Sequence, residues 1–426
     1  MKNRTQRNPW LWVPSIYFAE GLPYVAVMTV SVIMFKNMGI SNTDIALYTS
    51  WLNLPWIIKP LWSPFVDIFR TKRFWIVAMQ LLIGGALAGV ALTIPGANFF
   101  RWSLAFFWLL AFSSATHDIA VDGFYMMGLS KHQQAFFVGI RNTFYRLSML
   151  TGQGLLVMLA GFLTKKNGDV AHSWSIVFFI LSALFIAFFV YHLFISPRPV
   201  EDVPRKTANT GELFRAFGET IISFFTKKHA LVAILFMLLF RLGEAQLLKI
   251  ASLFMLDPPE KGGLGLMTAD IGMIYGTAGV IALVLGGILG GIVISVYGLK
   301  KCIFPMAVAL NIPNLVYVGM ALWQPASLGI VTSCVVFEQF GYGFGFTAYT
   351  LYMIYFSDGQ NKTAHYAICT AFMAAGMMFP GMASGWIQEL IGYKWFFIWV
   401  MFCTLPGFFL LPFLKIDSAF GTKKKG

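Results

Sequence analysis

Long apolar runs separated by short polar segments dominate this chain. A hydrocarbon core of roughly 30 Å needs about 20 apolar residues in a helix. Twelve runs of this kind fit between the polar breaks. The pattern therefore predicts an all-α, polytopic membrane protein with twelve transmembrane helices. The predicted spans cover residues 11–35, 44–67, 74–95, 102–128, 137–163, 173–195, 229–256, 269–297, 302–323, 326–356, 364–390 and 394–415.

One segment between the predicted spans is both long and polar. It covers residues 196–228 and begins SPRPVEDVPRKTANTGE. Proline, charged and small polar residues of this kind are typical of a connection between folded units. We expect a cytoplasmic linker here, joining an N-terminal bundle of six helices, residues 1–195, to a C-terminal bundle of six, residues 229–426.

The composition agrees with a membrane protein and sets its orientation. Of the 426 residues, 58% are hydrophobic and 12% are charged, outside the range of soluble domains. The basic residues that flank the predicted spans number nineteen on one side and six on the other. Since positive residues gather in cytoplasmic loops, both termini are expected in the cytoplasm. The net charge of +13 needs no nucleic-acid partner, because flanking bases contact anionic lipid.

The two halves can be aligned with each other. TDIALY at 43–48 matches ADIGMIY at 269–275 with an offset of 226, and GFYMMGLS at 123–130 matches TLYMIYFS at 350–357 with an offset of 227. A nearly constant offset predicts an internal structural repeat. Secondary transporters built from such repeats bind their solutes near the middle of the membrane.

Two carboxylates interrupt apolar runs in corresponding places. Glu20 and Glu244 lie 224 residues apart. An ionisable group at membrane depth is costly, and it usually belongs to an ion or solute pathway. Arg241 precedes Glu244 by three residues, so these two can neutralise each other on one helix face. Glu20 has no base one turn away and is the first candidate for proton coupling, followed by Asp118, Asp122 and Glu244.

Charged residues also occur in the predicted fourth and fifth helices. Asp118 and Asp122 lie one turn apart on one face. Arg141 and Arg146 on the next helix fall at matching depths, which predicts the ion pairs Asp122–Arg141 and Asp118–Arg146. Such pairs could form in one transport state only and act as a gate, or they could be structural throughout.

A third charged motif ends the second predicted span. In PFVDIFRTKR, Asp67 is followed by Arg70, Lys72 and Arg73. The corresponding LGGILGGIVISVYGLKK has Ser295 in place of the acid. These two stretches resemble the loop motif of the major facilitator superfamily, in which an acid and nearby bases form a charge relay that holds one conformation. The resemblance implies such a relay for Asp67, Arg70 and Arg73, and the alternative is that the bases only fix the topology.

Three stretches carry a resemblance to a known family: FAEGLPY, IIKPLWSPFVD and SATHDIAVDGF. They resemble muropeptide permeases of the AmpG type and, within the same group, acetyl-coenzyme A transporters. Twelve helices arranged as six plus six also resemble the major facilitator superfamily. His117 departs from the group, which usually has Gln there. The C-terminal half matches only in hydropathy and length.

The resemblance implies proton-coupled uptake of anhydro-muropeptides across a bacterial inner membrane by a monomeric carrier. The alternatives are transport of another anionic metabolite, such as an acyl-coenzyme A, or drug efflux. Bases at membrane depth could bind the carboxylates of such a solute, and aromatic rings could stack on its sugars. The substrate-binding candidates are Lys59, Arg241, Lys249, Trp51, Trp56, Trp62 and Tyr24.

Catalytic and metal-binding patterns are not evident. The six histidines lie mostly near span ends and none has metal-ligand spacing, and the four cysteines show no metal or redox spacing. We therefore expect no enzyme activity, no cofactor and no metal. The expected partners are a small-molecule solute, protons and the lipid bilayer.

Overall fold

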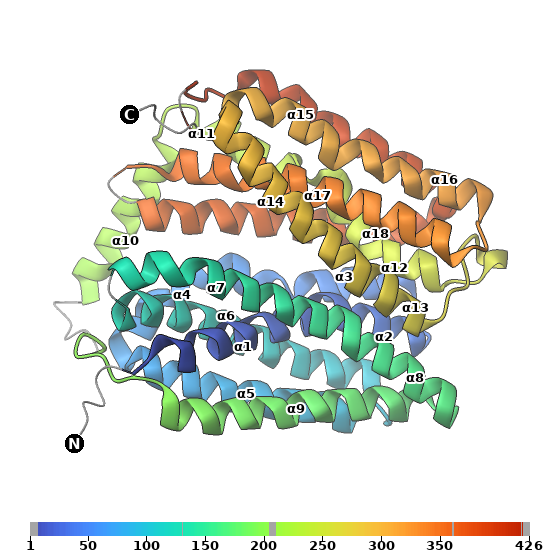
Figure 1. Ribbon diagram of the computed structural model, residues 1–426, viewed down its shortest axis with the longest axis horizontal. Coiled ribbons are helices and arrows are strands. Elements are labelled where there is room, and N and C mark those ends of the chain that lie inside the picture. The colour runs from blue at the N-terminus through green and yellow to red at the C-terminus, as the bar shows by residue number, and fades with distance from the viewer. Residues whose placement is uncertain (1–6, 130, 204–209, 360–361, 419, 421–426) are drawn as a thin grey trace. The chain divides into compact units, whose positions relative to one another are not determined.

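The computed structural model describes residues 7–129, 131–203, 210–359, 362–418 and 420, and every element in these ranges is helical (Figure 1). Some side chains within the helices are outside the description, namely those of residues 60, 64, 65, 67, 68, 131–136, 138, 139, 210, 212–214, 216, 217 and 362–364. The chain divides into two compact units. Unit 1 comprises Met1–Gly39 and Ile58–Thr210, and unit 2 comprises Ile40–Ile57 and Gly211–Gly426.

The helices of the two units are labelled in Figure 1. Unit 1 contains η1 Pro9–Leu11, α1 Val13–Val25, η2 Ala26–Val30, α2 Ser31–Asn37, most of α4 Leu54–Phe69, α5 Lys72–Thr93, α6 Phe99–Gly128, α7 Lys131–Met149, η3 Leu150–Leu156, α8 Val157–Asn167 and α9 Val170–Ile195. Unit 2 contains α3 Asn42–Trp51, α10 Thr210–Phe225, α11 Ala230–Leu239, α12 Leu242–Leu256, η4 Pro259–Lys261, α13 Thr268–Ile271, η5 Gly272–Gly279, α14 Val280–Tyr297, α15 Leu299–Asn311, η6 Ile312–Asn314, α16 Leu315–Trp323, α17 Leu328–Ser357, α18 Lys362–Leu410 and η7 Leu411–Phe413.

Within the described ranges, nine helical segments are long and apolar enough to cross a membrane. The last runs for 49 residues from His365 to Phe413 and contains two of the predicted spans. It bends at Gly392, whose φ of 74° suits a residue without a β-carbon. The other predicted spans outside the nine fall on α17 and on α3 with α4, which a turn at residues 52–53 separates.

The predicted linker is partly helical. Its second half forms α10, at the start of the second chain segment of unit 2. Phe224 of α10 is fully buried, with its ring 5.5 Å from that of Phe356 and 6.1 Å from that of Phe372. Ser223 Oγ lies 2.9 Å from His365 Nε2. The apolar face of α10 therefore packs on the unit, a feature that the polar start of the linker does not reveal.

Each unit has its own packed core and an apolar outer surface. In unit 1, α5 packs on α6 and α9, and α1 packs on α7. In unit 2, α14 and α15 pack on α17, while α3, α11 and α12 pack on α18. Large apolar side chains remain exposed on the outer helices, for example Leu92, Phe194, Leu285 and Phe409. Exposed apolar area on this scale is typical of a surface solvated by lipid.

Glycines allow α14 and α17 to approach each other closely. A β-carbon on Gly286 of α14 would lie 2.1 Å from the backbone oxygen of Phe340. One on Gly343 of α17 would lie 2.0 Å from the oxygen of Leu283. Backbone atoms cannot move aside as a flexible side chain can. The glycine-rich sequence of α14 is thus explained by helix contact, which small residues favour in membranes.

Two glycine variants of α14 test whether this close contact is needed for stability. Gly286→Ala should shift α14 away from α17 and destabilise the protein by about 1–3 kcal/mol, the usual cost of overpacking. Gly291→Ala, on the same helix, meets nothing within 4 Å and should be neutral or slightly stabilising. Thermal unfolding of the purified variants in detergent measures both. Equal stabilities would show that the close approach is not needed.

Candidate functional site

Charged side chains from four helices come together in unit 1. Lys59 of α4 forms an ion pair with Asp118 of α6. One turn further along α6, Asp122 Oδ1 lies 3.4 Å from Arg141 Nη1 of α7. Glu20 of α1 is the fifth member, and it interacts electrostatically with Asp118, Asp122 and Arg141. The packing of α1 on α6 and α7 helps to bring side chains of the cluster together.

Glu20 differs from the other two acids in forming no ion pair with a described residue. Its Oε2 atom is buried and has no hydrogen-bond partner among the described residues, which is also true of Asp122 Oδ1. Its carboxyl group interacts electrostatically with that of Asp118. Two neighbouring carboxyl groups repel each other when both are ionised, and a proton on one of them relieves that repulsion.

Arg141 is fixed by two tyrosines as well as by Asp122. Its Nη1 donates to the Tyr17 hydroxyl at 3.0 Å. The guanidinium carbon lies 4.7 Å from the centre of the Tyr17 ring and 5.2 Å from that of Tyr125. Both rings contribute cation–π attraction, which stabilises the charge where water is scarce.

One of the two expected ion pairs is present and the other is wrong. Asp122 pairs with Arg141, as its depth predicts. Asp118 pairs with Lys59 and not with Arg146, whose Nη1 points to Met149 Sδ at 3.8 Å. The prediction considered only α6 and α7. It missed that α4 brings a lysine to the same level.

The charges of this cluster do not balance. Glu20, Asp118 and Asp122 would carry three negative charges when ionised, and Lys59 and Arg141 carry two positive ones. Burial of an uncompensated charge is expensive, and a carboxyl group avoids the cost by binding a proton. One added proton would balance the charges of these five side chains.

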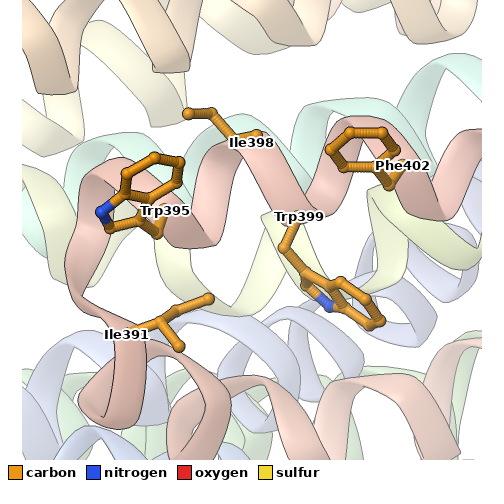
Figure 2. A pocket seen from close by; sticks show the side chains of 5 residues that line it. All are labelled: Ile391, Trp395, Ile398, Trp399 and Phe402. Carbon is orange, nitrogen blue, oxygen red and sulfur yellow. The ribbon is translucent and has the colours of Figure 1, made fainter.

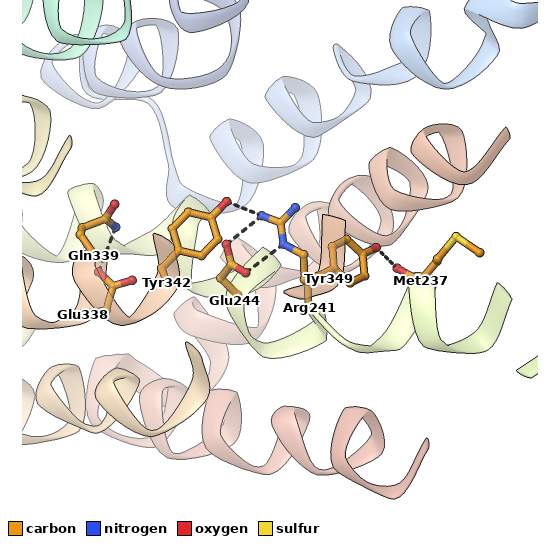
Figure 3. Close-up of polar contacts among 7 residues, drawn as sticks. All are labelled: Met237, Arg241, Glu244, Glu338, Gln339, Tyr342 and Tyr349. Atoms are coloured by element: carbon orange, nitrogen blue, oxygen red, sulfur yellow. Dashed lines mark hydrogen bonds and ion pairs between the residues drawn. The ribbon is translucent and has the colours of Figure 1, made fainter. Parts of the chain in front are cut away.

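In unit 2, Arg241 and Glu244 form a closed, buried pair (Figure 3). Two hydrogen bonds of 2.9 and 2.8 Å join the guanidinium to the carboxylate. Arg241 Nη2 also donates to the Tyr342 hydroxyl at 2.8 Å, and its guanidinium carbon lies 4.7 Å from the Phe346 ring centre. The side chains are 7% and 1% exposed. The neutralisation expected from their spacing of three residues is confirmed.

Another buried acid of unit 2, Glu338, accepts hydrogen bonds from neutral donors. Gln339 Nε2 donates to its Oε2 at 3.0 Å and the Tyr317 hydroxyl does so at 3.5 Å (Figure 3 shows the first of these). Glu338 is 1% exposed. No base among the described residues forms an ion pair with it.

The remaining substrate-binding candidates are distributed over both units. Lys249 of α12 is buried and donates to Thr49 Oγ1 at 3.0 Å. Trp51 of α3 is 38% exposed. The others are half-buried: Trp56 in unit 2, and Tyr24 and Trp62 in unit 1, where Trp62 packs against Phe112.

The loop motif after α4 has an unexpected acidic partner. At the start of α5, the backbone N–H groups of Lys72 and Arg73 donate to the buried Asp202 at 2.6 and 3.0 Å. The Arg73 guanidinium donates to the carbonyl of Leu193. Arg70 lies over the Phe74 ring at 5.5 Å. The Asp67 side chain lies outside the described residues, so its proposed relay stays a prediction.

A buried polar chain that the sequence did not indicate runs through unit 1. Ser15 Oγ lies 2.8 Å from His192 Nε2, whose ring contacts Gln80 Oε1 through Nδ1 at 3.0 Å. Gln80 Nε2 then contacts His117 Nε2 at 3.1 Å. The members come from α1, α5, α6 and α9, far apart in sequence. In the sequence, the only indication of this hydrogen-bonded network was His117, at a position where the related group usually has Gln.

A surface hollow on α18 is not suited to a charged solute. Ile391, Trp395, Ile398, Trp399 and Phe402 line it (Figure 2). The lining is almost wholly apolar, and Trp395 and Phe402 are 59% and 61% exposed. This character fits contact with lipid chains.

Comparison with known proteins identifies the family. Residues 15–365 match the sequence profile of the Major Facilitator Superfamily. The chain belongs to the major facilitator superfamily. The predicted all-α fold of this superfamily is confirmed, and the protein is a multi-pass membrane transporter.

Individual members of the superfamily refine this relationship. The anhydromuropeptide permease of Escherichia coli strain K12 is 26% identical over 406 residues, which are 92% of this chain and 77% of that permease. The resemblance to AmpG-type permeases thus extends over both halves. The solved nucleoside transporter NupG has a TM-score of 0.70 at 14% identity, covering 96% of this chain and 100% of that chain. A POT family transporter in complex with 5-aminolevulinic acid has 0.73 at 11%, covering 94% and 95%. These two structures share the fold.

The free energy of unfolding that is lost when an ion pair is broken depends on how exposed the pair is. Arg241→Met strands a fully buried carboxylate and should destabilise the protein by about 3–5 kcal/mol. Asp122→Asn breaks a pair that is 45% and 29% exposed, and it should cost about 1 kcal/mol or less. Unfolding of the purified transporter by denaturing detergent measures both.

The double variant Arg241→Met/Glu244→Leu is the control for this comparison. It removes both charges and should recover most of the lost stability, because no buried group is left unpaired. A double variant as unstable as the single one would assign the loss to packing and not to charge.

Proposed function

We propose that this chain imports anhydro-muropeptides into the cytoplasm of a bacterium by proton symport. It would act as a monomer in the inner membrane with both termini in the cytoplasm. The similarity to an anhydromuropeptide permease over 92% of the chain carries the proposal of substrate. The charge imbalance of the unit 1 cluster supports the coupling to protons.

The proton would bind between Glu20 and Asp118. Glu20 supplies a buried oxygen without a hydrogen-bond partner among the described residues, and Asp118 supplies a second carboxylate that interacts with it electrostatically. Asp122 is the less suitable site, because it is 45% exposed and Arg141 compensates its charge. Glu244 is also less suitable, since Arg241 holds both of its oxygens.

Lys59 would connect the proton to the solute. In the structure its ammonium group is bound by Asp118. A proton on the Glu20–Asp118 pair weakens the hold of Asp118 on the lysine, because the shared proton reduces the negative charge opposite it. Lys59 could then bind a carboxylate of the muropeptide. Such an exchange of partners favours loading of proton and solute together.

Other candidate residues take supporting roles in this proposal. Tyr24, Trp51 and Trp56 would stack on sugar rings, as half-buried or exposed aromatics can. Arg241 would contact solute only if its pair with Glu244 opened. Arg70, Arg73, Arg146 and Asp67 would act in conformational gating, where charge contacts change between states.

A cell that lacks its own muropeptide permease tests the proposal. The unmodified protein should restore recycling of labelled wall fragments. Lys59→Met should reduce their uptake at least tenfold, because Lys59 would bind the solute carboxylate when a proton weakens its ion pair with Asp118. Lys165→Met removes an exposed lysine at the end of α8 and should leave uptake unchanged.

The amount of folded protein in the membrane must be measured in parallel. If the unmodified protein is folded in the membrane and takes up no muropeptide, the substrate is another solute. An acyl-coenzyme A or an amphipathic drug would then be assayed next. If Lys59→Met transports normally, Lys59 has no part in coupling.

A further inference from the structure

The bases within the membrane spans differ in how far they are buried and in how they are neutralised. Lys59 is paired with Asp118 and Arg141 with Asp122 in unit 1. Arg241 is paired with Glu244 in unit 2. Lys249 of α12 is only 8% exposed, yet no carboxylate among the described side chains forms an ion pair with it. A buried ammonium group without a counter-charge is costly, so it calls for a functional explanation.

The surroundings of Lys249 leave hydrogen-bonding capacity unused. Its Nζ donates one hydrogen bond, to Thr49 Oγ1 at 3.0 Å. The Thr49 hydroxyl donates its own proton to the Ile45 carbonyl at 2.7 Å, so it can only accept from the lysine. An ammonium group has three donors. Two of them have no partner in the described part of unit 2.

A second unsatisfied donor lies beside the lysine. Ser50 of α3 is fully buried, and its Oγ has no hydrogen-bond partner among the described residues. Ser50 and Lys249 meet at Gly381 of α18. A β-carbon on Gly381 would lie 2.8 Å from Ser50 Oγ and 3.4 Å from Lys249 Cγ. The missing side chain of Gly381 therefore leaves room for both of these side chains against α18.

We propose that Lys249 and Ser50, with Thr49 orienting the lysine, form a binding subsite for a carboxylate of the transported solute. Three helices of unit 2 build it: α3, α12 and α18. The subsite rests on the proposed function and defines its substrate class as a solute with a free carboxylate.

The donor set favours a carboxylate over a more highly charged group. One ammonium and one hydroxyl provide a single positive charge and three hydrogens for the two oxygens of a carboxylate. A phosphate dianion would keep one negative charge uncompensated in a buried place, which is unfavourable. Phosphate sites usually gather arginines or several backbone N–H groups instead.

The first experiment needs no ligand. If this place binds an anion, the ammonium group of Lys249 has no counter-charge when the anion is absent, and it then lowers the stability of the protein. Lys249→Met should therefore raise the melting temperature of the ligand-free transporter in detergent, as replacement of functional residues often does. Arg241→Met, at the paired base of the same unit, should lower it. A Lys249→Met protein that melts as early as Arg241→Met would overturn the proposal.

The second experiment compares two solutes that differ in one charge. The probes are an anhydro-muropeptide with a free peptide carboxylate and the same compound with that carboxylate amidated. Lys249→Met should weaken binding of the acid by roughly tenfold or more, the range expected for a charged hydrogen bond. It should change binding of the amide little. Lys261→Met, in the loop after α12, is the control and should bind both probes as the unmodified protein does.

The pattern of losses separates the possible readings. Equal weakening of acid and amide, or no weakening of either, would contradict the carboxylate subsite. If the unmodified protein binds neither probe, the muropeptide assignment fails, and the melting temperature of Lys249→Met alone decides the subsite: a rise supports it and a fall overturns it. Gly381→Ala should reproduce the loss for the acid without removing any charge, because it narrows the same space.

Discussion

Neutralisation of charge at membrane depth is the constraint that orders both units. A buried ion costs several kcal/mol unless an opposite charge, a proton or a bound ligand compensates it. The Arg241–Glu244 pair meets the requirement completely, with two hydrogen bonds and 7% and 1% exposure. The described cluster around Glu20 has three acids and two bases, and Lys249 has no counter-charge among the described side chains. The proposed proton site and the proposed carboxylate subsite lie at these two places.

Close helix packing supports these charged groups. Gly341, Gly343 and Gly345 of α17 lie against the backbones of α14 and α15. The residues between and beside them, Tyr342 and Phe346, contact the Arg241 guanidinium. α17 thus packs closely on its neighbours through its glycines and contacts the Arg241 guanidinium through its aromatic rings. A larger residue in place of one of these glycines would shift α17 and so disturb the Arg241–Glu244 ion pair.

Hydropathy and spacing predicted the class of the protein and several of its charged contacts. The helical, polytopic fold follows from apolar run length, and the Arg241–Glu244 and Asp122–Arg141 pairs follow from helix geometry. The Asp118 partner was mispredicted, because its true partner, Lys59, lies 59 residues away on another helix. The contacts of Asp202 with α5 and of Gln80 with two histidines join segments more than 35 residues apart. Such pairings depend on which helices are neighbours, and periodicity within one helix does not contain that information.

The account depends most on Glu20 as part of the proton site, and one variant tests this directly. Glu20→Gln keeps the size and polarity of the side chain but cannot exchange a proton. In vesicles containing the purified protein, it should abolish muropeptide accumulation driven by a pH gradient and leave exchange of labelled for unlabelled muropeptide nearly intact, since exchange needs no net proton movement. Glu338→Gln, at a buried acid of unit 2, should retain both activities. Concentrative uptake by Glu20→Gln at the normal rate would contradict the account.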